Sequence, residues 1–506
     1  MWKGVMLYER AGFRRNRRII YTNEWERFLM FDLSKVFFGY SDADTEAERN
    51  PTEFTKVFFD PYDNLKELIS GHKFILYGRK GDGKTAYGAQ IKLTANQNGV
   101  YAYQRSLNNF NNDTFSQIKT NETISGNPYI SFWKAILLIE SVGMINRCQP
   151  NIQVGGFVDL VDSLVKYGFL CNDNDISVTV TKLVELDSSI SINSIVQHGR
   201  KYQHEEHLRG AEQIYSAIKR TIQTIYVQEK FVLILDGLDD ILNNREFKAE
   251  VFTGLIRAVD EINRAFKKTT MSIKCIILIR NDILTLCRDP NLSKFVRDSG
   301  IKLSWDVADD PFDSDLLKLV EKRVDAVSGK DSSLREMWQE VFPDTICGKN
   351  SIDYVLENVI YRPRDVLQFF IEVQKVFVKE KKLTEDKIQT ALSRYSDDYF
   401  VESMRDELTG FFSNDVVTAL PEVLSKMGTQ FFYASDFSDQ CSRNPVFNGV
   451  STNQILEKLF QAGYIGQHRP RERTDYTVFS YRNPREIFQE EHECILHRGL
   501  MRGLTI

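Results

Sequence analysis

The hydrophobic residues of this chain follow two patterns that alternate along the sequence. Short, mainly apolar runs at 74–77, 231–235 and 272–279 each end at a glycine or a charged residue. Such runs are typical of strands that are buried on both faces of a parallel sheet. Between and after them, apolar residues recur at helical spacing, for example at 129–145 and 366–377. The alternation predicts an α/β domain around a parallel sheet, followed by a mainly helical region.

The first apolar run leads directly into the octapeptide GRKGDGKT at 78–85, which fits the pattern G-x-x-x-x-G-K-[ST]. Glycines at these places let backbone N–H groups turn toward phosphate oxygens, and the following helix adds its positive end. The lysine is placed to reach the β- and γ-phosphates. A plain glycine turn would leave the Lys-Thr pair unexplained, so we expect a nucleotide phosphate loop. Its predicted binding residues are Gly78, Gly81, Gly83, Lys84 and Thr85, with the Thr85 hydroxyl also a Mg²⁺ ligand.

The second run ends in Asp236, followed by Gly237, Leu238, Asp239 and Asp240. A carboxylate at the carboxyl end of a buried strand lies at the sheet edge where nucleotides bind, so we expect Asp236 to hold Mg²⁺ through a water. Asp239 or Asp240 would then polarise the attacking water. Many P-loop ATPases have a glutamate where Gly237 stands here, which predicts a slow or conditional hydrolase. The alternative is a buried strand followed by an Asp-Gly turn.

Polar residues also follow the third run, at Arg280, Asn281 and Asp282. In the additional-strand class of P-loop domains this strand end lies next to the γ-phosphate, so Arg280 or Asn281 is expected to contact that phosphate. The alternative is that Arg280 pairs with Asp282 or with another carboxylate. No guanine-reading N-K-x-D tetrapeptide is evident, which favours ATP over GTP.

A pair of arginines, Arg362 and Arg364, precedes the apolar spacing at 366–377, with Pro363 in the first turn of the predicted helix. This arrangement resembles AAA+ and STAND ATPases, in which a helical lid supplies an arginine to the nucleotide. Arg364 is therefore our first choice for that contact, and Arg362 is the second. A purely structural role for both arginines stays open.

The C-terminal third has the outline of a winged helix, with three predicted helices at 416–427, 433–440 and 451–461 and then a hairpin to about 480. In this outline the third helix would read DNA and the turn of the hairpin would be the wing. The third helix offers only Lys458 as a cation. A structural or regulatory role for this domain therefore stays open beside DNA binding. The wing arginines able to touch phosphates are Arg469, Arg471 and Arg473.

The overall composition is that of an ordinary globular protein, with 506 residues, 42% hydrophobic and 27% charged, so two to four domains are expected. The net charge of −5 gives no global attraction to nucleic acid. Seven cysteines without a C-x-x-C pair indicate a reduced protein without a zinc site. His204 and His207 have no third ligand nearby and are expected on a solvated helix face. The chain has no apolar run of membrane-spanning length, so we expect a cytoplasmic protein without membrane contact.

These signals divide the chain into six expected segments. The boundaries are a basic extension at 1–33, the start of the nucleotide domain at 34–106, an insertion at 107–203, the rest of the nucleotide domain at 204–310, a helical lid at 311–410, and a winged-helix-like domain with a terminal segment at 411–506. Within the insertion, β-branched residues at 176–181 and 189–192 predict strands. The cationic cluster at 14–18 is a phosphate-binding arm, a solvated arm, or an extension upstream of a true start at Met30.

Four motifs together resemble an uncharacterised bacterial P-loop ATPase family over residues 34–506. They are FFGxxDAxxE at 37–46, the phosphate loop at 78–85, RPRD at 362–365 and HRGL at 497–500. Such proteins are similar to STAND (NACHT-like) and origin-recognition-type AAA+ ATPases and often occur in mobile or anti-phage defence loci. The resemblance implies an additional-strand P-loop domain with a helical lid and a C-terminal winged-helix-like domain.

The leading hypothesis is an Mg-ATP-dependent molecular switch that moves its lid and C-terminal domain, as a homo-oligomer or with an effector protein as partner. The chain has no recognisable nuclease, protease or NADase motif. The rival hypothesis is a loader- or initiator-type ATPase that engages duplex DNA through its winged helix. A third is a scaffold that binds nucleotide without hydrolysing it.

Overall fold

The structure of the chain is a computed structural model. It describes residues 31–95, 99–107, 129–149, 151–170, 176, 178–183, 208–238, 249–267, 271–287, 292–328, 333–379, 381–469, 476–483 and 485–506. Several predicted features lie outside these residues: the cationic cluster at 14–18, Met30, the strand at 189–192, His204, His207, Asp239, Asp240, Arg471 and Arg473.

A five-stranded parallel sheet forms the centre of the nucleotide domain, in the order β2-β3-β4-β1-β5. Its strands are β1 (Ile75–Gly78), β2 (Val100–Ser106), β3 (Lys230–Asp236), β4 (Ser272–Arg280) and β5 (Gly300–Lys302). Strand β4 lies between β1, which leads into the phosphate loop, and β3, which ends in Asp236. This inserted strand defines the additional-strand class, so the predicted fold class is confirmed.

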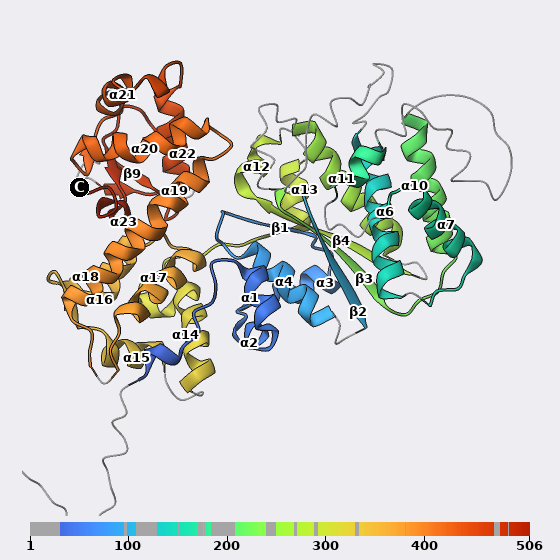
Figure 1. The fold of residues 1–506 in the computed structure, drawn as a ribbon, viewed down its shortest axis with the longest axis horizontal. Helices are drawn as coiled ribbons and strands as arrows, with labels where there is room; N and C mark the ends of the chain where they lie inside the picture. Colours follow the sequence, from blue (N-terminus) through green and yellow to red (C-terminus); the bar gives the residue numbers. More distant parts are fainter. Residues whose placement is uncertain are drawn as a thin grey trace, which may run out of the picture.

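Helices cover both faces of the sheet (Figure 1). One face carries α1 (Ala43–Arg49), α2 (Pro51–Val57), α3 (Asn64–Ser70) and α4 (Lys84–Ala95), and the other carries α6 (Tyr129–Cys148), α7 (Gly155–Lys166), α10 (Leu208–Gln223) and α11 (Ala249–Phe266). Alternate strand residues point to opposite faces: Leu76, Val232 and Ile276 pack toward α4, whereas Ile75, Leu233 and Ile277 pack toward α6 and α11. The short helices α12 (Asn281–Leu286) and α13 (Leu292–Ser299) follow β4.

The connection between β2 and β3 contains α6, most of which is buried because it lies between α10, α11 and the sheet. The predicted helix at 129–145 is thus confirmed. The predicted strand at 176–181 is wrong, because residues 178–183 are helical. Here Ile176, Val180 and Leu183 are all buried at helical spacing, so packing overrides the β-propensity of the branched residues.

The lid is a helical layer that follows β5. It contains α14 (Asp315–Ser328), α15 (Leu334–Val341), the small hairpin β6 (Thr345–Ile346) and β7 (Lys349–Asn350), α16 (Ser351–Asn358), α17 (Pro363–Val376), α18 (Glu385–Arg394), a π-helical segment (Tyr395–Phe400) and α19 (Val401–Leu408). Among the described residues, none of the helices of the chain is long and apolar enough to span a bilayer.

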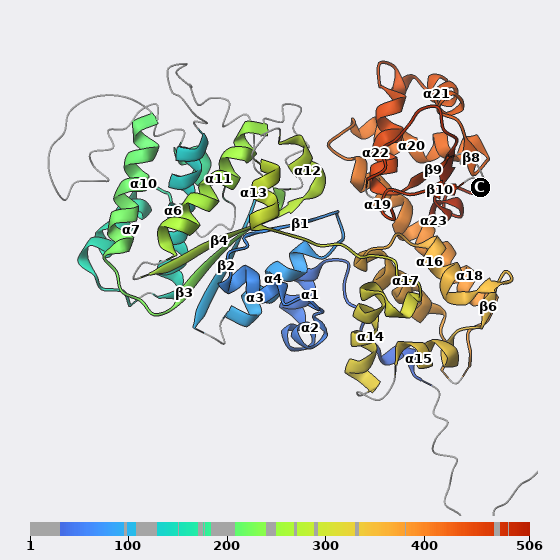
Figure 2. The same cartoon turned by 180° about the vertical axis from the view of Figure 1, so that it is seen from behind.

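The C-terminal domain contains the three predicted helices and the predicted hairpin, together with two further strands that the sequence pattern does not predict. It consists of α20 (Asn414–Met427), β8 (Phe431–Phe432), α21 (Ala434–Ser442), α22 (Thr452–Ala462), β9 (Ile465–Arg469) and β10 (Tyr476–Val478), after which β11 (Cys494–Leu496) pairs between β9 and β8 and α23 (Arg498–Met501) ends the fold. One continuous hydrophobic core runs through the lid and this domain. Figures 1 and 2 show the two stacked along one side of the nucleotide domain, as the shared core requires.

The FFGxxDAxxE segment joins the lid to the nucleotide domain. Phe38 stacks on Phe370 in the lid core, with ring centroids 4.8 Å apart, while Asp42 caps α1. Glu46 of α1 forms a buried ion pair with Arg323 of α14, at 2.9 Å. The sequence pattern assigns this segment to the start of the nucleotide domain at 34–106, whereas its first residues pack against the lid.

Gly39 is required by this junction, because its φ is +100° and an added Cβ would lie 2.3 Å from Glu46 Oε2. We predict that Gly39→Ala lowers the free energy of unfolding by about 1–3 kcal/mol. Urea unfolding followed by circular dichroism measures this loss. Gly155→Ala is the control, since an added Cβ there meets no atom within 4 Å. Equal unfolding midpoints for the two variants would contradict the prediction.

Candidate functional site

The phosphate loop lies between β1 and α4, at the carboxyl edge of the sheet. Gly81 and Gly83 have φ values of +86° and +99°, a region that disfavours any side chain, so the backbone N–H groups can turn toward one point. Asp82 is buried behind the loop, where Oδ2 accepts a hydrogen bond from the Arg79 backbone N–H at 2.6 Å. The Asp82 carbonyl accepts a further bond from Trp305 Nε1 at 3.1 Å. These contacts fix the loop shape before any ligand arrives.

Lys84 is the first residue of α4 and is 6% exposed. Its Nζ donates hydrogen bonds to the backbone carbonyls of Arg79 at 2.9 Å and Gly78 at 3.4 Å. The ammonium group therefore lies within the curve of the loop. Thr85 follows on the same helical turn, and both side chains line the same cleft.

This cleft, which we call the nucleotide cleft, is bounded by three parts of the chain. They are the loop at 80–85, the segment at 40–46, and the lid residues Arg323, Pro363, Arg364, Leu367, Gln368 and Ile371. An aromatic wall, Phe58, Phe59, Tyr87 and Trp305, completes it. The Phe58 and Tyr87 rings meet edge to face at 5.0 Å. A cationic, N–H-rich end and an aromatic end suit a ligand that has both phosphates and a flat ring.

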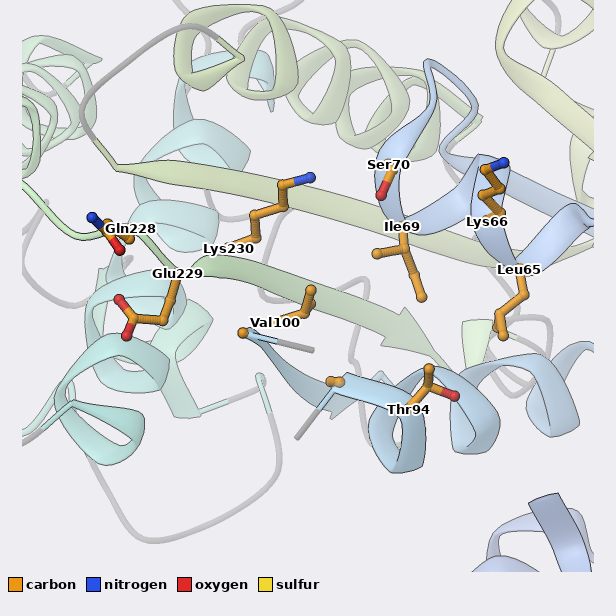
Figure 3. A pocket seen from close by; sticks show the side chains of 11 residues that line it. Leu65, Lys66, Ile69, Ser70, Thr94, Val100, Gln228, Glu229 and Lys230 are labelled. Carbon is orange, nitrogen blue, oxygen red and sulfur yellow. The ribbon is translucent and has the colours of Figure 1, made fainter. Parts of the chain in front are cut away.

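A different pocket of about 570 Å³ lies at the amino-terminal edge of the same sheet (Figure 3). Leu65 and Ile69 of α3, Thr94 of α4, and the first residues of β2 and β3, Val100 and Lys230, line it. Ligands of parallel α/β sheets bind at the carboxyl edge, where the helix N-termini point. The cleft at the phosphate loop, which lies at the carboxyl edge, is therefore the candidate nucleotide site.

Asp236 lies at the carboxyl end of β3, and its carboxylate is oriented by β2. Gln104 Nε2 donates to Asp236 Oδ2 at 3.2 Å and to Asp44 Oδ2 at 3.1 Å. Gln104 Oε1 is buried and has no hydrogen-bond partner among the described residues. A carboxylate, the Thr85 hydroxyl and this amide oxygen are the hard oxygen ligands that suit Mg²⁺. No group of three His, Cys, Asp or Glu side chains that suits a metal occurs in the described part of the chain, so phosphate oxygens would have to complete the site.

Arg280 and Asn281 do not line the nucleotide cleft. They line a second cavity of about 640 Å³ on the other side of the phosphate loop, together with residues of the C-terminal domain. Arg280 donates to both oxygens of Asp282, at 3.0 and 2.7 Å, and to Glu407 Oε2 at 3.0 Å. The pairing that we kept open as the alternative for Arg280 is thus the one present. Burial raises the pKa of Asp282, but the charge and hydrogen bonds of Arg280, the charge of Lys458 and the Ile283 backbone N–H together hold that pKa below its usual value.

Arg362 and Arg364 differ sharply in their surroundings. Arg362 is 2% exposed, and each of its three guanidinium nitrogens donates to the protein: Nε to Asp365, Nη1 to Glu407 Oε1 and the Lys80 carbonyl, and Nη2 to Ser403 and Tyr464. A guanidinium has five N–H donors, so no donor is left for a phosphate. Arg364 lines the nucleotide cleft and makes no hydrogen bond or ion pair with the described residues. The structure therefore separates the two: Arg364 remains the candidate, and Arg362 holds the protein together.

Two of the cations considered for DNA contact in the C-terminal domain, Arg469 and Lys458, have partners within the protein. Arg469 is 8% exposed and pairs with Glu486, so its predicted contact with DNA phosphates is wrong. Lys458 of α22 points inward, with Nζ 3.8 Å from the centroid of the Phe411 ring, and it lines the second cavity. The third helix thus presents its one cation to the nucleotide domain.

Sequence reasoning missed Glu407, Gln104 and the aromatic wall. Glu407 lies 45 residues after Arg362 on another helix, and no spacing rule links them. Gln104 lies on a strand whose polar residues carry no motif. The aromatic residues come from three separated segments, so only the fold brings them together.

Comparisons with known proteins agree with parts of this architecture. Residues 314–403, which make up most of the lid, match the family model of the FunZ-associated C-terminal helical domain. The chain is also 21% identical over 496 residues to the "Putative transposon gamma-delta 80.3 kDa protein" of Escherichia coli K12, covering 92% of this chain and 67% of that protein.

Two solved structures align along most of the chain. One is the ORC2 protein of Aeropyrum pernix in ADPNP–ADP complexes, with a TM-score of 0.38 and 14% identity over 89% of this chain and 93% of that one. The other is Cdc6p from Pyrobaculum aerophilum, with a TM-score of 0.25 and 12% identity over 87% and 92%. Because both TM-scores lie below 0.5, the fold assignment rests on the strand order and the phosphate loop.

Proposed function

We propose that this protein is an ATP-binding molecular switch that hydrolyses its nucleotide slowly. One observation carries the proposal: the phosphate loop and Arg364 of the lid face the same cleft at the carboxyl edge of an additional-strand sheet. The lid and the C-terminal domain share one core. A nucleotide that draws the lid toward the loop therefore moves the C-terminal domain with it.

Binding begins with groups that are already in place. The loop N–H groups and the N-terminus of α4 accept the phosphates, and Lys84 exchanges its two carbonyl partners for phosphate oxygens. The aromatic wall stacks against the base. Arg364 contacts the terminal phosphate from the lid side.

For hydrolysis, Thr85 and Asp236 would hold Mg²⁺, which would neutralise the developing phosphate charge. Asp239 or Asp240 polarises the attacking water in this proposal. Arg280 can contact the γ-phosphate only if it leaves Asp282 and Glu407, and Asn281 lines the second cavity instead of the nucleotide cleft. Both contacts therefore require a rearrangement after the nucleotide has bound. Together with Gly237 in the place of a glutamate, this favours slow turnover.

The second candidate is a loader- or initiator-type ATPase that binds duplex DNA. The element order of the C-terminal domain favours it, since helix, strand, helix, helix and two strands is the winged-helix order. The inward-facing Lys458 and the buried Arg469 count against it. The switch proposal also includes a homo-oligomer or an effector protein as partner, and a role in anti-phage defence. These features rest on the family resemblance alone.

We predict that Lys84→Ala weakens ATP binding about 10- to 100-fold, because losing hydrogen bonds from a charged group costs about 1.5–3 kcal/mol. Isothermal titration with Mg-ATP measures the loss. Lys66→Ala is the matched control, since Lys66 is an exposed lysine of α3 outside the nucleotide cleft. An unchanged affinity for ATP in Lys84→Ala would contradict the proposal. Tight ATP binding without hydrolysis in the wild type would instead favour the third hypothesis, a scaffold that binds nucleotide without hydrolysing it.

The two lid arginines should respond differently to substitution. Arg364→Ala is expected to reduce ATP turnover at least about tenfold while the unfolding transition stays in place. Arg362→Ala leaves Asp365 and Glu407 without their shared partner, and breaking a buried pair costs about 3–5 kcal/mol. Hydrolysis assays and urea unfolding on both variants check this contrast. If Arg364→Ala unfolds and Arg362→Ala does not, the assignments are reversed.

Duplex DNA separates the two candidate functions. If the protein is a switch, the rate of ATP hydrolysis should change less than about twofold when duplex DNA is added at 50–200 mM salt. A DNA-engaging ATPase would instead show stimulation that falls with salt and is lost in Arg471→Ala/Arg473→Ala. Strong, salt-sensitive stimulation would replace the first proposal with the second.

A further inference from the structure

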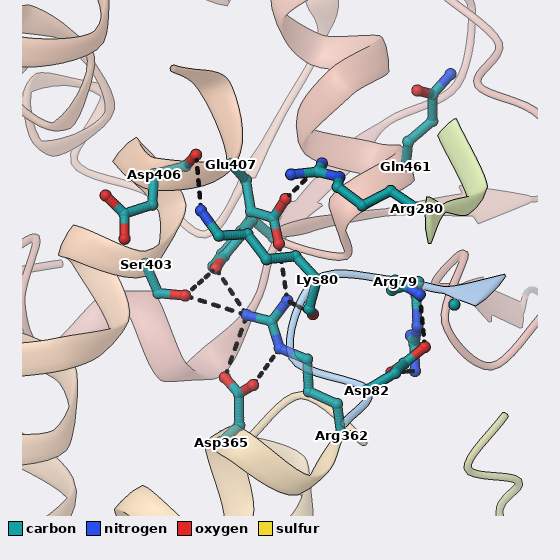
Figure 4. A network of polar contacts seen from close by, with 12 residues as sticks. Arg79, Lys80, Asp82, Arg280, Arg362, Asp365, Ser403, Asp406, Glu407 and Gln461 are labelled. Atoms are coloured by element: carbon teal, nitrogen blue, oxygen red, sulfur yellow. Dashed lines mark hydrogen bonds and ion pairs between the residues drawn. The ribbon is translucent and has the colours of Figure 1, made fainter. Parts of the chain in front are cut away.

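Glu407 lies where three parts of the molecule meet (Figure 4). It is 8% exposed, near the end of α19, and its two oxygens go to different arginines. Oε1 accepts from Arg362 Nη1 at 3.0 Å, and Oε2 accepts from Arg280 Nη2 at 3.0 Å. Arg280 ends strand β4 of the nucleotide domain, whereas Arg362 is the N-cap residue of helix α17 of the lid. One carboxylate thus connects the sheet to the lid.

Arg280, Arg362 and Glu407 form a charge cluster that contacts the phosphate loop on the side away from the nucleotide cleft. Arg362 Nη1 also donates to the Lys80 carbonyl at 3.1 Å, and Lys80 Nζ donates to the carbonyl of Asp406, the neighbour of Glu407, at 3.3 Å. Lys80 and Asp82 line both the nucleotide cleft and the second cavity. A change in the loop backbone on one side therefore reaches Glu407 on the other.

The charges show what Glu407 adds. Each arginine already has its own aspartate on its own element, since Arg280 pairs with Asp282 and Arg362 with Asp365. Glu407 is the additional acid between them, and without it two buried guanidiniums would face each other and repel. Burial raises the pKa of Glu407, but the positive charges of Arg280, Arg362 and Lys80 together hold that pKa below its usual value, so Glu407 stays ionised. Its distinctive role is to link the two pairs.

The backbone around Glu407 supports this role. The helix that carries it is preceded by a six-residue π-helical segment, Tyr395–Phe400, a rare form that is frequent at functional sites. Tyr395 binds Asp365 at 3.0 Å, and Tyr464 of the C-terminal domain binds Arg362 at 3.0 Å. Three residues of helix α22 line the second cavity: Glu457, Lys458 and Gln461. The cluster therefore extends from the loop into the C-terminal domain.

We propose that Glu407 is a positioning residue for nucleotide binding. By joining Arg280 to Arg362 it holds the Lys80 backbone in the phosphate-binding conformation and connects that conformation to the packing of α22. This inference rests on the proposed function of the cleft. Glu407 lines the second cavity and not the nucleotide cleft, so it acts through the loop and not on the nucleotide itself.

The test uses the full chain with Glu407→Gln, which keeps the side-chain size and leaves both aspartate pairs intact. The control is Glu402→Gln on the same helix, whose carboxylate is 57% exposed and pairs only with Arg405 among the described residues. Two readouts are compared: the Kd of a fluorescent N-methylanthraniloyl-ATP, and hydrogen exchange of peptides covering 78–85 and 452–462 with and without Mg-ATP.

We expect Glu407→Gln to weaken nucleotide binding about tenfold, to speed exchange in both peptides, and to abolish the ATP-induced change at 452–462. Glu402→Gln should match the wild type. Identical behaviour of the two variants, or faster exchange spread evenly over the whole chain, would overturn the inference. If the wild type does not bind the analogue, the proposed function fails instead, and the nucleotide-free exchange of the two peptides still tests whether Glu407 positions the loop.

Discussion

The backbone of the phosphate loop at 78–85 is the constraint on which the rest of the structure depends. Gly81 and Gly83 adopt positive φ values, and such a loop keeps one shape only if its outer side is held. Asp82 holds it from within, while Arg362 binds the Lys80 carbonyl from the lid. The inner side is then free to offer N–H groups to phosphate. Arg362 and Glu407 thus shape the candidate binding site although neither of them lines the nucleotide cleft.

This arrangement explains why the lid and the C-terminal domain form one body. Their common hydrophobic core leaves the junction with the nucleotide domain as the place where relative movement can occur. That junction is polar: it contains the pairs Glu46–Arg323 on one side of the loop and Glu407 with its two arginines on the other. Polar contacts of fixed geometry favour discrete arrangements over gradual deformation, which is what a switch requires.

Features coded by local sequence could be predicted. The loop, the strands that flank it, and the helix order of the C-terminal domain all follow from runs and spacings within about twenty residues. The strand predicted at 176–181 is wrong, because burial of apolar side chains at helical spacing outweighs the β-propensity of the branched residues.

The roles of the arginines could not be derived in the same way. Arg280, Arg362 and Arg364 look alike in sequence, and their roles depend on which carboxylates the fold brings within reach. Glu407 is the clearest case, since it meets Arg280 from 127 residues away. The sequence allowed both a phosphate contact and an ion pair for each arginine, and only the packing of α19 against the loop distinguishes them.

The central claim is that a nucleotide occupies the cleft between the phosphate loop, the aromatic wall and the lid. Photolabelling with 8-azido-ATP in the presence of Mg²⁺, followed by peptide mass spectrometry, tests it most directly. We expect labelled peptides from 40–59, from the surroundings of Trp305, or from 364–371, with labelling suppressed by excess ATP. Labelling confined to the second cavity or to the pocket at the amino-terminal edge, or labelling that ATP does not suppress, would contradict the account.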